Sequence, residues 1–177
     1  MNSSATTVIN ACSPIVHKKV KSWKPRSGSD GGSAITTELM HAYCAGLFDG
    51  DGCIYISRTH TRERKNPTYR LCVNFAQSCA VTVNRFRDVL GVTGYLYEVA
   101  RTTQHNRQAY SLNFDGKCAV QVIQILRPYL LRKSAEADLA LQFWNTCSVS
   151  LHPGPKGTPP EVWAKREALY RKMRALK

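Results

Sequence analysis

Acidic residues are scarce in this chain, with 12 Asp and Glu against 25 Lys and Arg, and the formal net charge is +13 at pH 7. A balance this basic favours a polyanionic partner, with nucleic acid first and an anionic membrane surface second. The alternative is a soluble protein that is merely basic.

Long apolar runs are also missing. No segment approaches the roughly 20 apolar residues that a membrane helix requires, and the N-terminus has no apolar core typical of a secretory signal. We therefore expect an intracellular protein that is not secreted and has no membrane partner. Residues 1–35 are basic and rich in Ser and Thr. This arm fits either an organelle targeting segment, for a chloroplast or mitochondrion, or a flexible nucleic-acid-binding tail.

Paired cysteine motifs are absent as well. The chain has 7 cysteines, an odd number, and none of them forms a C-x-x-C pair. This spacing argues against a structural zinc site and against a disulfide framework. We expect mostly buried thiols in a reducing compartment.

Hydrophobic periodicity organises residues 36–151 into one domain. Helical spacing and period-two alternation follow each other in the order helix 35–50, strands 53–59 and 69–77, helix 81–91, strands 94–101 and 107–115, and helices 117–131 and 134–151. This order predicts an α+β fold whose sheet has one face covered by helices and one polar, open face. Residues 152–177 read as a linker and a basic C-terminal helix. That helix would clamp phosphates, dock through Val162, Leu169 and Met173, or do both.

Two carboxylates, Asp49 and Asp51, end the first predicted helix. They oppose the helix dipole, at a cost of about 0.3–1 kcal/mol each when exposed. Glycines on both sides of Asp51 would let the chain turn sharply there. A hard divalent cation held by carboxylate and carbonyl oxygens would explain the acids. An EF-hand does not fit, because Cys53 and Ile54 replace a polar ligand and a glycine. A solvated Asp-Gly turn is the simpler alternative.

The stretch "CAGLFDGDG", residues 44–52, resembles the signature of the LAGLIDADG homing endonucleases, with apolar changes at Cys44 and Phe48 and with Gly50 in place of Ala. The resemblance implies an αββαββα fold with a saddle-shaped antiparallel sheet, followed here by C-terminal helices. It also implies a site-specific double-strand DNA endonuclease of the intron-homing kind that uses Mg²⁺, for which Mn²⁺ can substitute. In this family the second motif aspartate, here Asp51, is a metal ligand, and the carbonyl of Gly50 is a second candidate.

Only one such motif is present, since Asp115 and Gly116 follow a predicted strand rather than a helix. Two-metal phosphodiester hydrolysis needs several oxygen ligands, so the resemblance implies a homodimer with the motif helices at its two-fold axis. A homodimer in turn implies a long, near-palindromic DNA site. The residues expected at this dimer interface are Ala45, Gly46, Phe48 and Asp49, and Asp49 is also expected to order the turn.

Two further residues match positions that the family uses around its metals. Gln77, at the end of a strand, would order water near the attacked phosphate, and Lys133 would stabilise the phosphate or activate water. The structural alternatives are an amide that caps the next helix and a solvated charge between helices. Arg132 is the alternative in register for Lys133, and Arg85 and Arg87 are candidates for a further arginine near the site.

The polar sheet face is the expected DNA-reading surface, because a two-stranded ribbon fits the major groove. By strand parity this face comprises Tyr55, Ser57, Thr59, Arg70, Asn74, Tyr97, Arg107, Ser111 and Asn113. The charged loop around residues 60–67 would meet phosphates or outer bases. Each of these residues also fits an ordinary exposed strand position.

Two other functions fit the same chain. One is a catalytically retired RNA-binding protein, either an intron maturase or a ribosome-associated protein, for which RNA is the partner. The other is a DNA-binding regulator that keeps the fold without cutting. The presence of Asp51 together with Gln77 and Lys133 favours the active enzyme.

Overall fold

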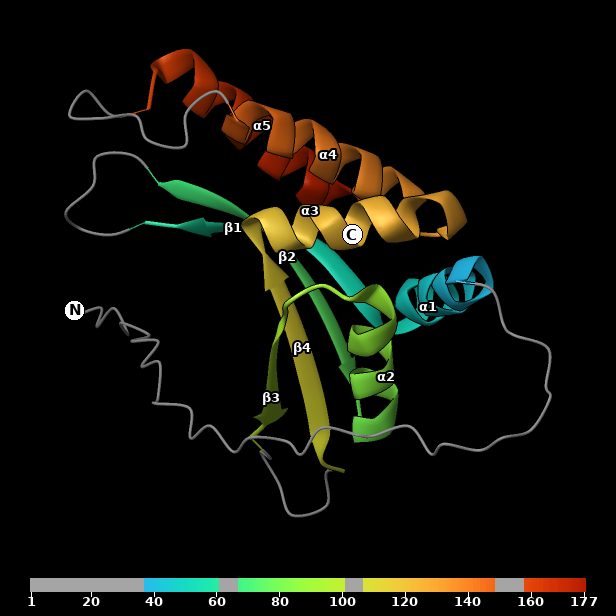
Figure 1. Ribbon diagram of the computed structural model, residues 1–177. Coiled ribbons are helices and arrows are strands. Elements are labelled where there is room, and N and C mark those ends of the chain that lie inside the picture. The colour runs from blue at the N-terminus through green and yellow to red at the C-terminus, as the bar shows by residue number, and fades with distance from the viewer. Residues whose placement is uncertain (1–36, 61–66, 101–106, 149–157) are drawn as a thin grey trace, which may run out of the picture.

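The computed structural model describes residues 37–60, 67–100, 107–148 and 158–177. Within these ranges the elements follow the predicted order, which confirms the αββαββα arrangement (Figure 1). They are α1 (Thr37–Asp51), β1 (Gly52–Thr59), β2 (Thr68–Gln77), α2 (Ala80–Leu90), β3 (Tyr95–Val99), β4 (Ala109–Asp115), α3 (Gly116–Leu126), the 3₁₀ turn η1 (Arg127–Tyr129), α4 (Ser134–Ser148) and α5 (Pro160–Ala175).

The strands form one antiparallel sheet in the order β1-β2-β4-β3. Successive residues of a strand point to opposite faces, and burial follows this alternation. Ile54 in β1, Val73 in β2 and Phe114 in β4 lie opposite one another on the buried face. The residues between them are mostly half-buried or exposed, so the second face is the open one that the alternation predicts.

The core lies between the sheet and the helices. The ring of Phe86 in α2 stacks on Phe75 in β2 at 4.2 Å between centroids, and on Phe48 in α1 at 6.2 Å. All three side chains are almost fully buried. Burying one such aromatic contributes about 1.5–3 kcal/mol, so this stack holds α1 and α2 firmly against the sheet.

Glycine and proline set two helix boundaries. α2 stops where predicted, because Gly91 adopts a left-handed φ of 60° and its N–H donates to the carbonyl of Arg87 at 3.0 Å. The helix predicted over 117–131 ends earlier, at Leu126, and continues as the 3₁₀ turn η1. Pro128 lies in that turn and has no N–H to extend the α-helical ladder.

The C-terminal helix α5 packs beside β1 and α4 (Figure 1). Met173 is buried and Leu169 packs against the core, as predicted for docking. The carboxylate of Glu167 accepts a hydrogen bond from the Tyr69 hydroxyl and pairs with Arg171 at 2.8 Å. β1 is an edge strand of the sheet, and α5 packs against it. No helix in the described ranges is long and apolar enough to cross a membrane.

Candidate active site and nucleic-acid interface

The end of α1 carries the two aspartates and passes directly into β1 at Gly52. The chain turns sharply here, as expected, but neither Gly50 nor Gly52 uses a positive φ to do so. In the part of the chain that the structure describes, only Gly91 and Gly116 have a positive φ. Gly52 is needed for space instead, because a Cβ at this position would clash with the ring of Phe48. The turn is therefore built on a close approach between the backbone and a core side chain.

Asp49 ties this turn to the segment before α4. Its carboxylate accepts hydrogen bonds from the backbone N–H of Leu131 at 2.8 Å, of Arg132 at 3.1 Å and of Lys133 at 3.0 Å. Burial acts to raise the pKa of Asp49, but these hydrogen bonds and the charge of Lys133 outweigh it and keep the pKa below its ordinary value. Asp49 thus orders the turn, the role expected for it.

Lys133 lies underneath the same turn and is only 4% exposed. Its ammonium donates to the carbonyl of Asp49 and lies 5.9 Å from the centroid of the Phe48 ring. Burial lowers the pKa of Lys133, and the positive charge of Arg132 lowers it further. Arg132 contacts the same carbonyl through Nε at 2.9 Å, but its side chain is exposed. Two cations thus compensate the negative end of α1, which explains how the helix tolerates Asp49.

Asp51 has different surroundings. It is exposed, and its carboxylate accepts a hydrogen bond from the side-chain amide of Gln77. Among the described residues it pairs with no Lys or Arg. The structure therefore brings together two of the predicted catalytic residues. Gln77 has the strand parity of Phe75, so it reaches Asp51 from the helix-covered side of the sheet rather than from the open face.

A carboxylate with a neutral neighbour suits a hard cation such as Mg²⁺, which prefers oxygen ligands. The exposed backbone of Gly50 lies next to Asp51 in the sequence and adds a carbonyl. However, the described residues contain no group of three His, Cys, Asp or Glu side chains that could hold a metal ion. The oxygen donors of Asp51 and Gly50 are of the kind that such a metal prefers.

The predicted dimer interface needs correction at two residues. Ala45 is 0% exposed and Phe48 is 1% exposed, so neither offers surface to a partner. Helical periodicity turns these positions toward the core of their own chain. The outward face of α1, which we call the α1 stripe, consists of Leu39, Tyr43, Gly46 and Gly50. It retains the predicted Gly46, and a Cβ on either of its glycines would meet no atom within 4 Å in the single chain.

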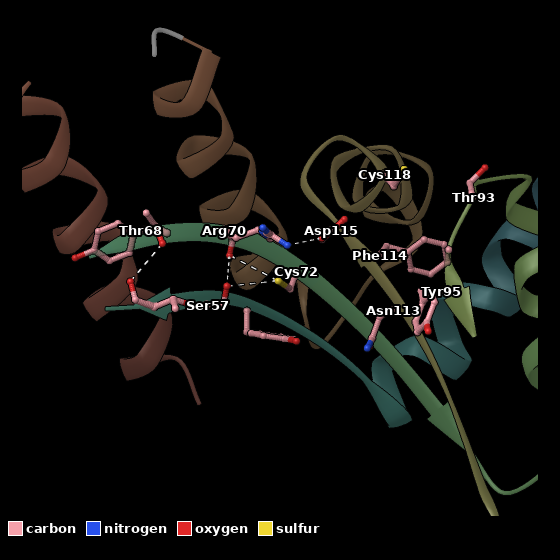
Figure 2. A pocket seen from close by; sticks show the side chains of 14 residues that line it. Ser57, Thr68, Arg70, Cys72, Thr93, Tyr95, Asn113, Phe114, Asp115 and Cys118 are labelled. Carbon is pink, nitrogen blue, oxygen red and sulfur yellow. Dashed lines mark hydrogen bonds and ion pairs between the residues drawn. The ribbon is translucent and has the colours of Figure 1, made fainter. Parts of the chain in front are cut away.

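The open sheet face forms a groove of about 1020 Å³ (Figure 2). The predicted DNA-reading residues that line it are Tyr55, Ser57, Thr59, Arg70 and Asn113. Burial raises the pKa of Tyr55 to about 12, with neighbouring Cys72 adding to the effect, so its hydroxyl stays protonated and able to donate. Strand parity places Cys72, Tyr95 and Asp115 on this face as well, and none of the three is among the predicted DNA-reading residues.

Three of the remaining predicted residues, Asn74, Ser111 and Tyr97, form a network with Asn113 on the same face. The amide of Asn74 donates to the hydroxyl of Ser111 at 2.6 Å and also to Asn113, whose own amide donates to the Tyr97 hydroxyl at 3.2 Å. Ser111 is 4% exposed, so the expectation that it reads bases directly is wrong. Its neighbours cover it, and it supports Asn74 instead. Arg107 lies exposed ahead of β4.

No protein-family profile matches the sequence, and no curated protein matches it either. Solved structures do match. The homing endonuclease I-CvuI in complex with its target is 23% identical with a TM-score of 0.63, over 80% of this chain and 83% of that one. The archaeal intron-encoded homing endonuclease I-Vdi141I complexed with DNA is 14% identical with a TM-score of 0.66, over 80% and 86%.

The group I intron-encoded homing endonuclease I-CeuI complexed with DNA is 15% identical with a TM-score of 0.62, over 81% of this chain and 69% of that one. At these identities the likeness establishes the fold. Together with the order of elements and the sheet topology, it shows that this chain has the LAGLIDADG homing-endonuclease fold.

Proposed function

We propose that this chain is a site-specific double-strand DNA endonuclease of the intron-homing kind, which hydrolyses phosphodiester bonds as a homodimer with a divalent metal. The observation that carries the proposal is the Asp51–Gln77 pair, exposed at the tip of α1 on this fold. The similar solved structures are homing endonucleases in complex with DNA, which supports the same activity here.

In this mechanism the carboxylate of Asp51 and the carbonyl of Gly50 hold Mg²⁺, and Mn²⁺ can replace it. The bound metal supplies Lewis acidity and lowers the pKa of water at the scissile phosphate. Gln77 fixes the Asp51 carboxylate through its amide N–H. Lys133 places a positive charge beneath the turn, where it favours the extra negative charge that develops on the phosphate.

The α1 stripe is the surface that we assign to the homodimer. Its glycines lack side chains, so two α1 helices can approach each other closely. Leu39 and Tyr43 are 61% and 57% exposed and supply apolar area to the same contact. A two-fold axis through this stripe brings together the two helix tips that carry Asp51. The DNA site is then near-palindromic, since each copy reads one half.

The decisive experiment incubates the full chain with Mg²⁺ and a randomised duplex library, and sequences the cleaved molecules. We expect one near-palindromic site to be cut. Asp51→Asn should abolish cutting while binding of that site and the melting temperature persist. Asp88→Asn is the matched control, because Asp88 is an exposed aspartate on α2 that pairs with Arg87 at 3.3 Å.

Three outcomes would overturn the proposal. The first is specific cutting by Asp51→Asn at the wild-type rate. The second is a strict monomer, by sedimentation, at micromolar concentration with the duplex. The third is tight binding of structured RNA without any cleavage of DNA, which would support the retired RNA-binding protein instead. Replacing Mg²⁺ by Mn²⁺ in the same assay tests the second metal.

A further inference from the structure

Among the described residues that line the groove on the open face of the sheet, only Asp115 carries a carboxylate, and it lies beside Arg70 (Figure 2). Asp115 ends β4 and Arg70 lies in the neighbouring strand β2. The two side chains form an ion pair at 2.9 Å between Nη1 and Oδ2. They are 67% and 61% exposed, so both remain accessible from the groove.

Ordinary structural roles do not explain this carboxylate. Asp115 occupies the N-cap position of α3, where an aspartate usually accepts a hydrogen bond from the helix N–H groups, yet its side chain makes no such bond. Gly116, the first residue of α3, has a φ of 52°, and the chain turns there without that cap. A well-exposed ion pair contributes little to folding. A negative group would also repel the phosphates of a bound duplex.

The geometry points to a reading function, and this inference rests on the proposed function. We propose that Arg70 and Asp115 together recognise one G·C base pair in each half-site. Arg70 donates to O6 and N7 of guanine, and Asp115 accepts from the N4 amino group of the paired cytosine. A guanidinium has five N–H donors and a carboxylate has two oxygens. The single bond between Nη1 and Oδ2 therefore leaves donors on one group and an acceptor on the other.

The donors of Arg70 and the acceptor of Asp115 are complementary to a G·C pair in the major groove, where guanine presents two acceptors and cytosine presents a donor. An A·T pair presents a donor on adenine, which would face Arg70 with donor against donor. The ion pair also has a positioning effect. It holds the long side chain of Arg70 in one orientation on the open face before DNA arrives, which reduces the ordering cost of binding.

The competing explanation is that Asp115 only neutralises Arg70. The two explanations predict different binding profiles. Neutralisation alone predicts that loss of the carboxylate raises affinity for every duplex alike, because one repulsive charge is removed. Reading predicts a change at one base pair in each half-site and at no other position.

The test is a binding selection of the full chain from a randomised duplex library, with sequence profiles compared between variants. We expect Asp115→Ala to reduce the preference for G·C at one position of each half-site by about tenfold, and Arg70→Ala to affect the same position. The double variant should lose no more than the larger single loss. Asp115→Asn, which keeps an acceptor oxygen, should retain part of the preference. Asp88→Ala, which removes an aspartate from α2, should leave the profile unchanged.

Melting temperatures of all variants should lie close to that of the wild type, because the ion pair is exposed. A sharp wild-type profile that Asp115→Ala leaves unchanged, or shifts equally at all positions, overturns this inference while the proposed function survives. A wild-type chain that enriches no sequence overturns the proposed function and this inference together. A loss of preference at different positions for Asp115→Ala and Arg70→Ala also overturns joint recognition.

Discussion

Replacing Asp49 by Asn should destabilise the fold through the turn before α4. One carboxylate oxygen, Oδ2, accepts from the N–H of Leu131 and of Arg132, and the other, Oδ1, accepts from the N–H of Lys133. In Asp49→Asn an oxygen can replace Oδ2, but the amide NH₂ must then face the N–H of Lys133. One hydrogen bond to a charged acceptor is lost outright and two are weakened. We expect a loss of about 2–3 kcal/mol in the free energy of unfolding.

The assay is urea unfolding of the full chain at a fixed protein concentration, since association adds to apparent stability. Asp88→Asn is the control, because its partner is its sequence neighbour Arg87 on the same helix, and it should change stability by less than about 0.5 kcal/mol. Asp51→Asn should also change the free energy of unfolding little, since the Asp51 carboxylate is exposed and accepts a hydrogen bond from a neutral side-chain amide.

The pH dependence of the stability provides a second check on the role of Asp49. The pKa of Asp49 in the folded chain is below its ordinary value of 3.8. A lowered pKa means that the stabilisation is fully present above 3.8 and is lost as the pH falls through the folded-state pKa. The difference in the free energy of unfolding between wild type and Asp49→Asn should therefore stay constant from pH 7 to about 5 and become smaller below pH 3.8. A difference under about 0.5 kcal/mol at pH 7, or one that widens on acidification, refutes this account of the turn.

Three other substitutions test the surrounding structure. Gly52→Ala should cost about 1–3 kcal/mol in urea unfolding, because the new methyl group meets the Phe48 ring. Met173→Ala should cost about 2–5 kcal/mol and, in limited proteolysis, expose α5 to cleavage before the rest of the chain, because Met173 is the buried anchor of that helix. Lys133→Met should reduce DNA cleavage at least about tenfold while site binding persists; unchanged cleavage would remove Lys133 from the mechanism.

The sheet could be predicted from the sequence because the alternation of apolar and polar residues lies within each strand. Alternation in β1 and β2 separates Ile54 from Tyr55 and Val73 from Asn74, and burial in the structure follows the same parity. The end of α2 was predictable for a similar reason, since Gly91 alone specifies it. The position of Ser111 within its face was not, because its burial results from side chains on neighbouring strands.

The orientation of α1 was only partly predictable, and the reason is its composition. Ala45 and Phe48 lie on the inner face, whereas Leu39 and Tyr43 lie on the outer face. Both faces are apolar, so the sequence identifies a helix with two packing surfaces but does not say which surface belongs to its own core. The resemblance to a dimeric family drew attention to the motif residues without separating the two faces.

The contacts of the acidic turn were beyond local reasoning. Asp49 and the segment from Leu131 to Lys133 are more than eighty residues apart in the sequence. No spacing rule connects such residues, because the fold alone brings η1 and the segment after it onto the end of α1. The Asp51–Gln77 pair was anticipated only because a family resemblance named both residues. Their hydrogen bond spans two elements that local patterns treat separately.

The two aspartates at the end of α1 have different partners and therefore different roles. Asp49 is compensated within its own chain by backbone N–H groups and by Lys133. Asp51 is bonded to a neutral amide, so its negative charge adds to the negative end of the α1 dipole. Two such tips side by side would repel each other by about 1 kcal/mol at 4 Å in water. In the proposed homodimer, the apolar area of the α1 stripe would offset that repulsion, or a divalent cation would remove it. In the proposed function, dimer formation and metal binding are therefore linked through this one turn.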